Sequence, residues 1–491
     1  MEDLSLSNNL SRRVFVKGLG LVSVGLILGT MGGCDLDKLI EAIANRPTRR
    51  RLRIGSPEVD ADIATYQQGV TLMKNLPVGD PRSWNNQAGI HGTVNGGFKW
   101  CQHSSFGSYN DHFFDWHRAF LLNFERIIQK LTGNAKFGLP YWNWNQNPDI
   151  HPAFLDPSSS LFLARTRTTM TGEPTGAVTT ATLDPFFTDT NLFTFSHQIE
   201  GTPHNTVHGY IDNTMATGGS ALDPIFWAHH CMVDYCWAKW NFELGHNNPN
   251  DPNWTGTDDQ HFVDADGNPT SSTAGITTIM PLLSYQYESS AIGSSPATAA
   301  IKTKSAYQKL EQRIRAGANV RFDIKQRIPI AERASISIAR PASRETKMST
   351  ADFASIVNSD TAKERIFATV EFAELPATSD FAVRVFVNLP TADTRTPSSD
   401  PHYAGSFAFF GTQLPNAPAA AEHQHQQPKF LVNITNTLQR LKKNQELKEG
   451  TPVSVQLVAV PFGGKFEKED TELVLNKIEI IITPVTVEDQ R

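Results

Sequence analysis

Residues 200–234 constrain the fold more than any other stretch, because three histidines stand there in a spacing typical of metal ligands. His204 and His208 are four residues apart, so a helix that carries both presents them on one face, where they can hold one metal ion together. A turn at residues 223–224 precedes a new apolar helix that contains His230. A helix that begins there would direct His230 back at that pair. Three imidazoles without a thiolate or carboxylate suit copper, zinc, iron or nickel and leave one coordination position open.

A second group of histidines precedes this stretch and ends at His117. From His117 onward, apolar residues recur at helical spacing as far as Leu131, so this imidazole shares the core-facing stripe of an amphipathic helix. A single histidine on such a stripe is more often a buried core residue than a ligand. His91 and His103 stand upstream, however. Two groups of three histidines, each with one at the start of a helix, are what a binuclear metal centre in a four-helix bundle requires.

Both groups of histidines lie within longer motifs. FFDWHR at residues 113–118 is followed by Glu125, and DPIFW at residues 223–227 is followed by Asp234. With these motifs the chain resembles the type-3 copper family of tyrosinases, catechol oxidases (polyphenol oxidases) and haemocyanins. The resemblance implies a first copper ion held by His91, His103 and His117 and a second held by His204, His208 and His230. His229 stands beside a ligand position of the motif but not on it.

The first group departs from the family's pattern in its spacing. His103 and His117 are fourteen residues apart, which is longer than the usual separation, and we interpret residues 106–111 as a small insertion in a loop. His112, directly after this insertion, is the alternative ligand. Cys101 stands two residues before His103, similar to the Cys-x-His of fungal and some bacterial relatives, in which the sulfur is joined to the histidine ring. The resemblance therefore implies a Cys101–His103 thioether, with a free buried thiol as the alternative.

Two residues near His204 bear on the reaction. Glu200, four residues before His204, and Asn205, directly after it, match the glutamate and asparagine that hold a water molecule in tyrosinases. A monophenol must lose its phenolic proton, and its pKa of about 10 makes phenolate scarce at neutral pH, so a carboxylate acting through that water can take the proton. The plainer interpretation is that both residues only cap the helix of His204.

Three further motif residues have expected roles beside the metals. Phe226 is expected to line the copper pocket. Arg118 directly follows His117, and Asp234 lies one turn after His230. We interpret Arg118 and Asp234 as structural ion-pairing or helix-orienting groups rather than as acid–base catalysts.

The resemblance implies copper-dependent oxidation of phenols by O2 to o-quinones through a peroxide-bridged dicopper centre. The expected activity is o-diphenol oxidation together with ortho-hydroxylation of monophenols, on small phenolic substrates. A haemocyanin-like oxygen-binding protein, or a diphenol-only catechol oxidase or o-aminophenol oxidase, would use the same six histidines. A zinc hydrolase can use one group of three histidines but needs no second group.

The first 34 residues resemble a twin-arginine export signal. SRRVFVK at residues 11–17 leads into an apolar stretch at residues 18–33, which is shorter than the roughly 20 residues that span a membrane. The stretch ends at Cys34 in a sequence similar to a bacterial lipobox. We therefore expect residues 1–34 to direct export to the periplasm or the cell exterior, with membrane attachment only through this signal or a lipid on Cys34. Cleavage near residues 42–44 without lipidation is the alternative.

Composition bounds the rest of the chain. With 491 residues and 39% hydrophobic content, it can bury a large core and form two domains. The net charge of -6 is modest, and the basic cluster at residues 46–53 is a solvated segment or a source of salt bridges rather than a nucleic-acid site. Apart from Cys34, three cysteines remain, an odd number that argues against a disulfide framework. Two of them, Cys231 and Cys236, fit the core side of a helix.

The expected fold class is α + β. Residues 50–289 contain all nine tryptophans and are expected to form a mainly α-helical catalytic domain with a four-helix bundle, which includes a helix at residues 59–76. Residues 290–365 are expected to be a connecting region with some helical character at residues 307–315. Residues 366–484 alternate like strands, for example at residues 381–387, 453–457 and 478–482, which predicts an antiparallel β-sandwich.

The C-terminal part resembles the C-terminal domain of plant polyphenol oxidases, on YAGSF at residues 403–407, HQH at residues 423–425 and the closing strands. In latent polyphenol oxidases this domain shields the active site, often with an inserted side chain. The resemblance therefore implies a shielding domain, although no plugging residue is indicated. His423 and His425 lie in an Ala/Pro/Gln-rich stretch that predicts a solvated loop, with a transient copper site as the alternative.

Overall fold

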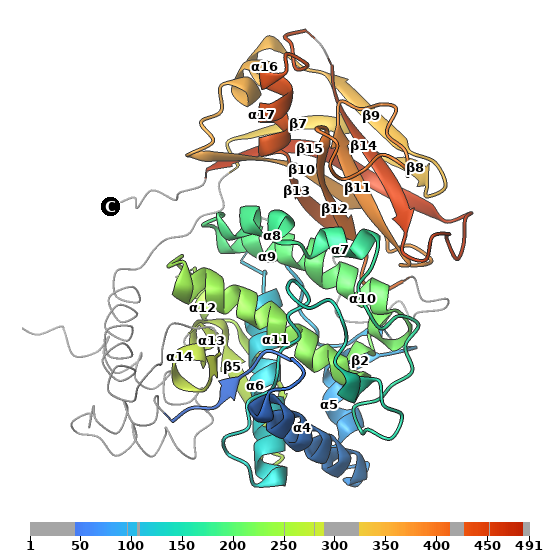
Figure 1. Ribbon diagram of the computed structural model, residues 1–491. Helices are drawn as coiled ribbons and strands as arrows, with labels where there is room; N and C mark the ends of the chain where they lie inside the picture. The colour runs from blue at the N-terminus through green and yellow to red at the C-terminus, as the bar shows by residue number, and fades with distance from the viewer. Residues whose placement is uncertain are drawn as a thin grey trace, which may run out of the picture.

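The computed structural model of the chain describes residues 45–95, 97–105, 109–249, 251–278, 280–288, 324–412, 427–450 and 452–484. We call residues 45–288 the helical domain and residues 324–484 the sheet domain, which lies against one end of the helical domain (Figure 1). The predicted signal at residues 1–34, the helix expected at residues 307–315, and His423 and His425 all lie outside the described residues. Within the described ranges, no helix is both long and apolar enough to cross a membrane.

Helices that carry or support the candidate site run through the helical domain. They are α4 (Pro57–Asn75), α5 (Trp84–His91), α6 (Phe113–Thr132), α9 (Leu192–Ile199), α10 (Asn205–Ile211) and α11 (Pro224–Ala238). The helix predicted at residues 59–76 is confirmed as α4, whose expected core face is buried. The helix predicted from His117 onward is confirmed as α6, which ends at Thr132; the next residue, Gly133, has a φ of 71°, a conformation that favours glycine.

Helix α11 begins at the predicted turn. The Asp223 side chain accepts a hydrogen bond from the N–H of Ile225, and Pro224 occupies the first helical position, where its missing N–H removes no helix hydrogen bond. Every residue of α11 except Tyr235 is buried, so the helix runs through the centre of the domain. Helix α11 packs against α6, which brings the two motif helices together.

Shorter elements complete the helical domain. They are β1 (Thr48–Arg49), β2 (Gly92–Thr93), β3 (Gly97–Phe98), α7 (Glu173–Ala177), α8 (Thr180–Phe187), α12 (Pro252–Thr255), β4 (Asp258–Val263), β5 (Pro269–Thr273), α13 (Ala274–Thr277), α14 (Met280–Leu283) and β6 (Gln286–Tyr287). Strand β1 pairs in parallel with β6, so the first and last described segments of the domain lie side by side.

The sheet domain consists of strands with two helices. They are β7 (Gln326–Ala331), β8 (Ala334–Ser337), β9 (Ala342–Lys347), α16 (Thr350–Val357), β10 (Glu364–Phe372), β11 (Phe381–Val387), β12 (Tyr403–Ala408), β13 (Lys429–Asn433), α17 (Thr435–Lys443), β14 (Pro452–Pro461) and β15 (Glu472–Pro484). One sheet runs β13-β10-β15-β7, with β8 also paired to β15, and the other runs β12-β11-β14-β9. All of these pairings are antiparallel.

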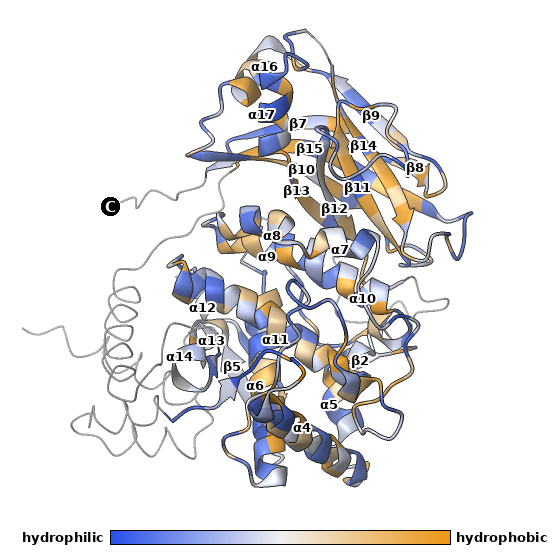
Figure 2. Cartoon of the chain, viewed as in Figure 1, coloured by the Kyte–Doolittle hydropathy of each residue, from blue (hydrophilic) through white to orange (hydrophobic). Residues whose placement is uncertain are grey.

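The two sheets share one apolar core. Val383 and Val385 of β11 pack in the same cluster as Ile478 and Ile480 of β15. In Figure 2 these strands are largely hydrophobic, whereas much of α17 is hydrophilic. The three strands predicted from alternation are therefore confirmed as β11, β14 and β15.

The sheet domain begins earlier than the sequence predicts. Strand β7 pairs with β15, with Ile328 opposite Ile480, and β9 pairs with β14. The prediction of a connecting region up to residue 365 is therefore wrong from residue 326 onward. These strands are short and lie at sheet edges, where side chains face solvent, and in β9 only Ala342 is buried. Their polar composition is that of a linker, and only the pairing shows that they are strands.

The sheet domain is in close contact with α10 and α7 of the helical domain. A Cβ atom on Gly209 of α10 would lie 2.9 Å from the main-chain oxygen of Ser379, so glycine allows the two backbones to approach this closely. Arg384 of β11 forms a largely buried salt bridge with Glu173 of α7. The second face of β11 is buried by this contact, because Ala382 belongs to the apolar core of the helical domain.

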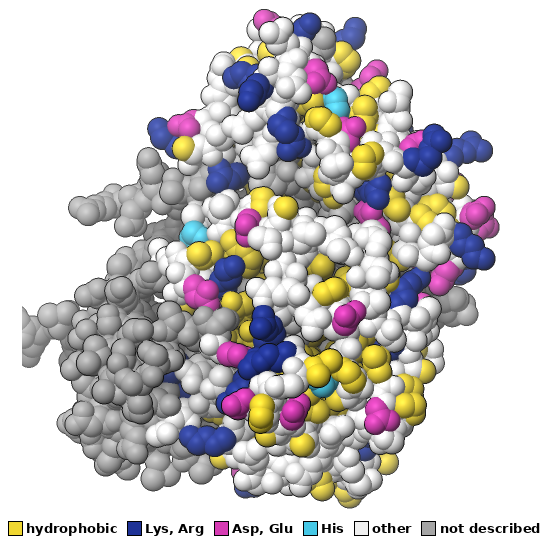
Figure 3. All heavy atoms as spheres, viewed as in Figure 1, with side chains coloured by type: hydrophobic (Ala, Val, Ile, Leu, Met, Phe, Trp, Pro, Cys, Tyr) yellow, Lys and Arg dark blue, Asp and Glu magenta, His cyan; other side chains and the backbone are white. Residues whose placement is uncertain are grey.

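Charge is mixed over the surface. Figure 3 shows Lys and Arg side chains interspersed with Asp and Glu on the visible face, with no large patch of one sign. The basic cluster at residues 46–53 is partly internal, because Arg49 is fully buried and Arg50 forms a salt bridge with Asp62. The cluster therefore supplies salt bridges to the helical domain, as one of its two interpretations predicted.

Candidate metal centre

The histidines predicted as metal ligands converge inside the helical domain. In the first group, His91 ends α5, His103 lies in the loop before α6, and His117 lies in the first turns of α6. In the second group, His204 ends a π-helical turn at Glu200–His204, His208 lies on α10, and His230 lies on α11. All except His103 are at most 2% exposed. The side chain of His103 keeps 32% exposure and lies at the edge of the group.

The second group is the tighter one. The Nε2 atom of His230 lies 3.4 Å from Nε2 of His204 and 3.2 Å from Nε2 of His208. Burial and repulsion from neighbouring imidazoles lower the pKa of all three rings well below its ordinary value, so the rings are neutral at physiological pH. Three neutral imidazoles directed at one point have lone pairs that a metal ion can satisfy.

Oxygen acceptors determine which ring nitrogen carries the hydrogen. Nδ1 lies 2.7–2.8 Å from a main-chain carbonyl oxygen in three rings, contributed by Gly218 to His91, by Phe113 to His117 and by Met215 to His208. A carbonyl oxygen only accepts, so Nδ1 must donate and Nε2 keeps its lone pair for a metal. Nε2 of His91 accordingly has no hydrogen-bond partner among the described residues.

Glu200 and Asn205 provide the same kind of acceptor for His103 and His204, whereas Nδ1 of His230 has no hydrogen-bond partner among the described residues. Glu200 Oε1 accepts a hydrogen bond from Nδ1 of His103 at 2.7 Å, and Oε2 accepts from the N–H of Ser104 at 2.8 Å. Asn205 Oδ1 accepts from Nδ1 of His204 at 2.8 Å. Burial raises the pKa of Glu200, but hydrogen bonds from His103 and Ser104 outweigh it and hold the pKa below its ordinary value. Glu200 is therefore a carboxylate that orients His103, a role that the sequence did not indicate.

Copper fits this set of donors. Imidazole nitrogens suit copper, and no carboxylate, the ligand that calcium and magnesium prefer, takes part in either group of ligand atoms within the described residues. The oxygen acceptors behind the rings provide the outer contacts that fix a ligating imidazole. The structure therefore supports a metal centre of two adjacent histidine groups.

Two other histidines lie close by, and the ring orientation of His229 does not suit it to bind the metal. His229 has a ring nitrogen within 4.8 Å of the second group, but Trp144 donates its indole N–H to Nδ1 of His229 at 3.1 Å. Nδ1 must then accept, so Nε2 of the neutral ring carries the hydrogen and has no lone pair to give. His112, the alternative ligand of the first group, contacts Asp115 through Nδ1 at 2.9 Å and stacks on Trp254. Within the described residues, neither His112 nor His103 has a ligand atom in the two close groups, so the choice between them stays a prediction.

Cys101 lies inside the first group. Its Sγ atom is 3.6 Å from Nε2 of His117, and the ligand atoms of His91, Cys101 and His117 lie within 4.8 Å of one another. His103 also neighbours the thiol: burial raises the pKa of Cys101, but the imidazoles of His91, His103 and His117 outweigh it and lower the pKa. The predicted Cys101–His103 thioether stays a prediction.

A cavity of about 690 Å³ adjoins the first group. His103, Glu200 and Asn205 line it from the helical domain, and residues of the sheet domain close it on the other side. Phe226 does not border this cavity. It is fully buried, with its ring centroid 4.9 Å from that of His91 and 4.2 Å from that of His230, so it packs between the two groups.

Comparison with known proteins agrees with this geometry. The family model described as the common central domain of tyrosinase matches residues 81–186 and 164–243, and a domain of unknown function (DUF7868) matches residues 317–480. Tyrosinase HcTyr1 of Hahella sp. is 29% identical over 290 residues, which are 46% of this chain and 61% of that protein. The chloroplastic polyphenol oxidase of Malus domestica is 31% identical over 247 residues, which are 40% of this chain and 41% of that protein.

Over residues 81–243 the chain matches the type-3 copper family of tyrosinases and polyphenol oxidases. The structure of latent apple tyrosinase matches with a TM-score of 0.60 at 21% identity, covering 89% of this chain and 97% of that one. Recombinant latent aurone synthase matches with a TM-score of 0.61 at 20% identity, covering 90% of both chains. This likeness shows the shared fold, a helical core followed by a sheet domain. The chain spans less than two thirds of the curated relatives it matches, at 61% and 41% of their lengths.

A side chain of the sheet domain reaches the two histidine groups. The Phe410 ring stacks on His208, with 4.0 Å between ring centroids and 27° between planes, and meets the edge of His204 at 5.4 Å. It also packs against Phe98 and is only 6% exposed. Phe410 therefore covers the second group. It follows β12 directly, and its approach to α10 could not be predicted from local sequence.

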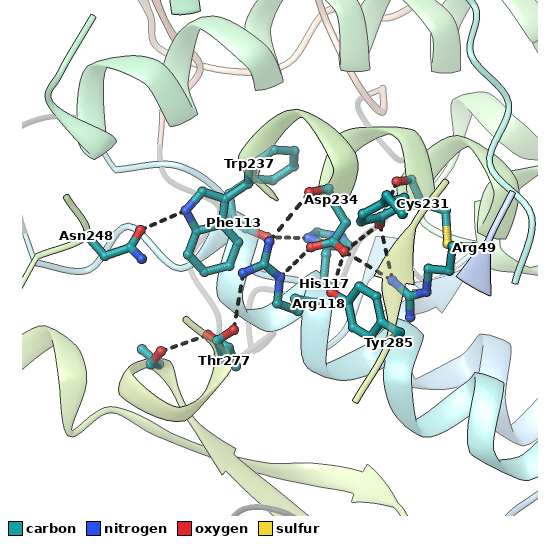
Figure 4. A network of polar contacts seen from close by, with 12 residues as sticks. Arg49, Phe113, His117, Arg118, Cys231, Asp234, Trp237, Asn248, Thr277 and Tyr285 are labelled. Atoms are coloured by element: carbon teal, nitrogen blue, oxygen red, sulfur yellow. Dashed lines mark hydrogen bonds and ion pairs between the residues drawn. The ribbon is translucent and has the colours of Figure 1, made fainter. Parts of the chain in front are cut away.

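A buried network of charges connects the two motif helices (Figure 4). Asp234 of α11 pairs with Arg118 of α6 and with Arg49 of β1, which also pairs with Glu125 of α6 at 2.8 Å. The hydroxyl of Tyr285 donates to Asp234, as does that of Tyr287. The prediction that Arg118 and Asp234 are structural ion-pairing groups is confirmed: they pair with each other and hold together the helices that carry His117 and His230.

Sequence reasoning missed the other members of this network. Arg49 lies 76 residues before Glu125 and 185 residues before Asp234, and its guanidinium carbon lies 3.6 Å from the ring centroid of Tyr285. Two signals could have indicated it: the Tyr-x-Tyr pair at residues 285–287, and an arginine in a segment that also carries apolar residues.

Proposed function

We propose that the protein oxidises phenols with O2, using two copper ions. The observation that carries this proposal is the pair of adjacent histidine groups, in which the Nδ1 atom of every ring except His230 donates to a fixed oxygen acceptor and leaves Nε2 available for metal. The first ion would be held by His91, His103 and His117, and the second by His204, His208 and His230. When bound, the copper pair supplies the binding of O2 and the electrons that reduce it.

The reactions are balanced as follows. Two o-diphenols and one O2 give two o-quinones and two waters. One monophenol and one O2 give one o-quinone and one water. Both reactions need a site that binds a planar ring and handles phenolic protons, and the cavity beside His103 has the aromatic Phe98 and the carboxylate of Glu200 on its walls.

Glu200 is the group that we propose to take the phenolic proton through a bound water. Its pKa is held below its ordinary value, so it is ionised at neutral pH, and a monophenol with a pKa of about 10 needs such a base more than a diphenol does. Asn205 lines the same cavity and is positioned by His204. The low pKa makes Glu200 a weak base, so its contribution is the placement of the water rather than strong basicity.

We also propose that the docked form is latent. Phe410 covers the second group, and the relatives with the same fold include a latent apple tyrosinase and a latent aurone synthase. Opening would require the sheet domain to leave α10, which breaks the salt bridge between Arg384 and Glu173. A cut between residues 289 and 323, outside the described ranges, should release the domain and raise activity on bulky diphenols.

The remaining parts of the proposal rest on sequence with support from packing. Helices α4, α6, α10 and α11 are proposed as the four-helix bundle around the metals, and the two sheets as a β-sandwich. The Cys101–His103 thioether is supported by the burial of Cys101 beside the first group. Export by residues 1–34, with or without a lipid on Cys34, completes the proposal.

Substitution of Glu200 and Asn205 tests the monophenol reaction. Glu200→Gln keeps an oxygen that can accept from His103, so both coppers should remain while monophenol oxidation falls at least about tenfold more than diphenol oxidation, or about 1.4 kcal/mol. Asn205→Gly should show the same selective loss. Copper content and both rates are measured on each variant. Equal losses on both substrates would mean that these residues act only structurally, and two zinc ions per chain with no copper would refute the proposed oxidase.

A further inference from the structure

The segment 197–205, which contains Glu200, is hydrogen-bonded to main-chain carbonyls of the sheet domain. Three of its side chains donate across the interface: His197 Nε2 to Lys429 O at 2.8 Å, Thr202 Oγ1 to Ser406 O at 2.8 Å, and Asn205 Nδ2 to Ala408 O at 3.0 Å. The three donors are buried, with exposures of 5%, 5% and 7%. We call these contacts the carbonyl clamp. The clamp brackets Glu200 on both sides.

The clamp fixes the amide of Asn205. On one side Oδ1 accepts from Nδ1 of His204, and on the other Nδ2 donates to Ala408 O, so the plane of the amide is held from both ends. Asn205 and Glu200 line the same cavity of about 690 Å³. While the sheet domain is docked, one amide hydrogen therefore goes to protein instead of to a water beside Glu200.

The clamp also reaches Glu200 through His197. The carbonyl of Lys429 only accepts, so Nε2 of His197 carries the hydrogen, and burial lowers the pKa of His197 to about 4, which keeps the ring neutral. Nδ1 must then accept, and its partner at 2.8 Å is the hydroxyl of Ser104, which also contacts Oε2 of Glu200. Ser104 has one hydroxyl hydrogen. The Oε2 atom of Glu200, to which Ser104 donates, and Nδ1 of His197 therefore compete for that hydrogen, and docking at Lys429 fixes the competing ring.

The cover and the clamp are separate groups. Phe410 covers His208 with its side chain, whereas the clamp at Asn205 uses the main-chain oxygen of Ala408, two residues earlier. A substitution at Phe410 can remove the cover and leave the clamp in place. The two effects of docking can thus be measured independently.

We propose that the docked sheet domain selects the kind of phenol that reacts as well as limiting access. With the clamp closed, the groups that hold water beside Glu200 are engaged by the sheet domain, and the site oxidises diphenols but not monophenols. Release of the clamp frees the amide of Asn205 and the ring of His197 and permits monophenols to react. This inference rests on the proposed function, in which Glu200 and Asn205 hold the water that takes the phenolic proton.

The test compares full-length variants that all lack the Phe410 cover. In one the clamp stays closed, and in the others the sheet domain is undocked so that the clamp opens. Phe410→Ala removes the cover. Phe410→Ala with Arg384→Glu also undocks the sheet domain, because it sets a carboxylate against Glu173 in place of the salt bridge. Adding Glu173→Arg restores an opposite-charge pair and serves as the matched control. Gly209→Leu with Phe410→Ala is an independent route to undocking, because a side chain there meets the main chain of Ser379.

Docking is measured by small-angle scattering and copper content by elemental analysis. Oxidation rates are measured with 4-methylphenol as the monophenol and 4-methylcatechol as the diphenol. The expected result is that Phe410→Ala keeps the compact scattering profile and oxidises the catechol, with a monophenol-to-diphenol ratio at least about tenfold below that of the undocked variants, as expected for one or two positioned hydrogen bonds. The charge-swapped control should return to the low ratio. Equal ratios in docked and undocked variants would overturn the inference and leave the proposed function intact. Undocked, copper-loaded variants that oxidise only the catechol would overturn both the inference and the monophenol part of the proposed function.

Discussion

Asp234→Asn should destabilise the helical domain by about 3–5 kcal/mol, the cost of breaking a buried ion pair by removing one partner. The network holds two arginines, Arg49 and Arg118, against two carboxylates, Glu125 and Asp234, and all four side chains are at most 1% exposed. Loss of one carboxylate leaves an uncompensated positive charge in the core. This cost is a large share of the roughly 5–15 kcal/mol that stabilises a typical domain.

The hydrogen bonds of Asp234 add to this cost. The hydroxyls of Tyr285 and Tyr287 donate to the same oxygen, Oδ2, so an amide NH2 at that place would face two donors. If the amide turned the other way, its NH2 would face Arg118, which binds Oδ1. Tyr285→Phe, which keeps the ring beside Arg49, should cost only about 1–2 kcal/mol because one hydrogen bond is lost.

The assay is urea unfolding followed by tryptophan fluorescence. All nine tryptophans lie between Trp84 and Trp254, so the signal reports on the helical domain. Asp266→Asn is the matched control, because the Lys130–Asp266 pair is about half exposed and should change stability by less than about 0.5 kcal/mol. A loss below about 1 kcal/mol for Asp234→Asn at pH 7 would refute the view that this network bears buried charge.

The pH dependence gives a second check. Burial raises the pKa of Asp234, but Arg118, Arg49 and the two tyrosines outweigh it and hold the pKa below its ordinary value. A carboxyl group with a lowered folded-state pKa contributes stability that is present above the unfolded pKa of about 3.9 and is lost as pH falls through the folded pKa. The difference between wild type and Asp234→Asn should therefore be constant from about pH 5 to 8 and shrink below about pH 4.

Three further outcomes are expected. His117→Ala should lose one copper per chain and all oxidase activity, whereas His112→Ala should keep both coppers; elemental analysis decides, and loss of a copper in His112→Ala would make it the ligand. His229→Gln should also keep both coppers, because Trp144 already fixes its ring as a non-ligand; a copper deficit would contradict that assignment. Gly209→Ala should weaken docking and raise diphenol oxidation, whereas Gly176→Ala, where a Cβ meets nothing within 4 Å, should change neither; equal rates in the two variants would argue against docking as the barrier.

The local parts of the fold and site could be predicted from sequence because they depend on short-range spacing. The four-residue interval between His204 and His208, the Asp-Pro start of α11 and the apolar repeat of α6 each follow from helix geometry or capping. Alternation with a period of two residues predicted β11, β14 and β15. It did not predict β7 to β9, because edge strands with solvent-facing side chains have the composition of a connecting segment.

Long-range partners could not be predicted, because no local pattern encodes them. Glu200 fell on a motif position associated with a water molecule, but its contact with His103 spans 97 residues and shows that it also orients a ligand. His112 and His103 were both candidates for one ligand position. Spacing did not separate them; the structure shows a partner for each ring, Glu200 for His103 and Asp115 for His112, and the choice stays a prediction.

The carbonyl clamp illustrates a stricter limit. Its acceptors are main-chain oxygens, which every residue of a strand has, so side-chain identity at Ser406, Ala408 or Lys429 carries no information about them. What determines the clamp is the register of β12 and β13 against the segment 197–205. Only the donors of the clamp depend on side-chain identity, because positions 197, 202 and 205 each require a side chain with an N–H or O–H group. A change at any donor would leave a buried carbonyl without its partner, at a cost of about 1–3 kcal/mol to docking. The reaction that the site performs and the stability of its cover would then change together.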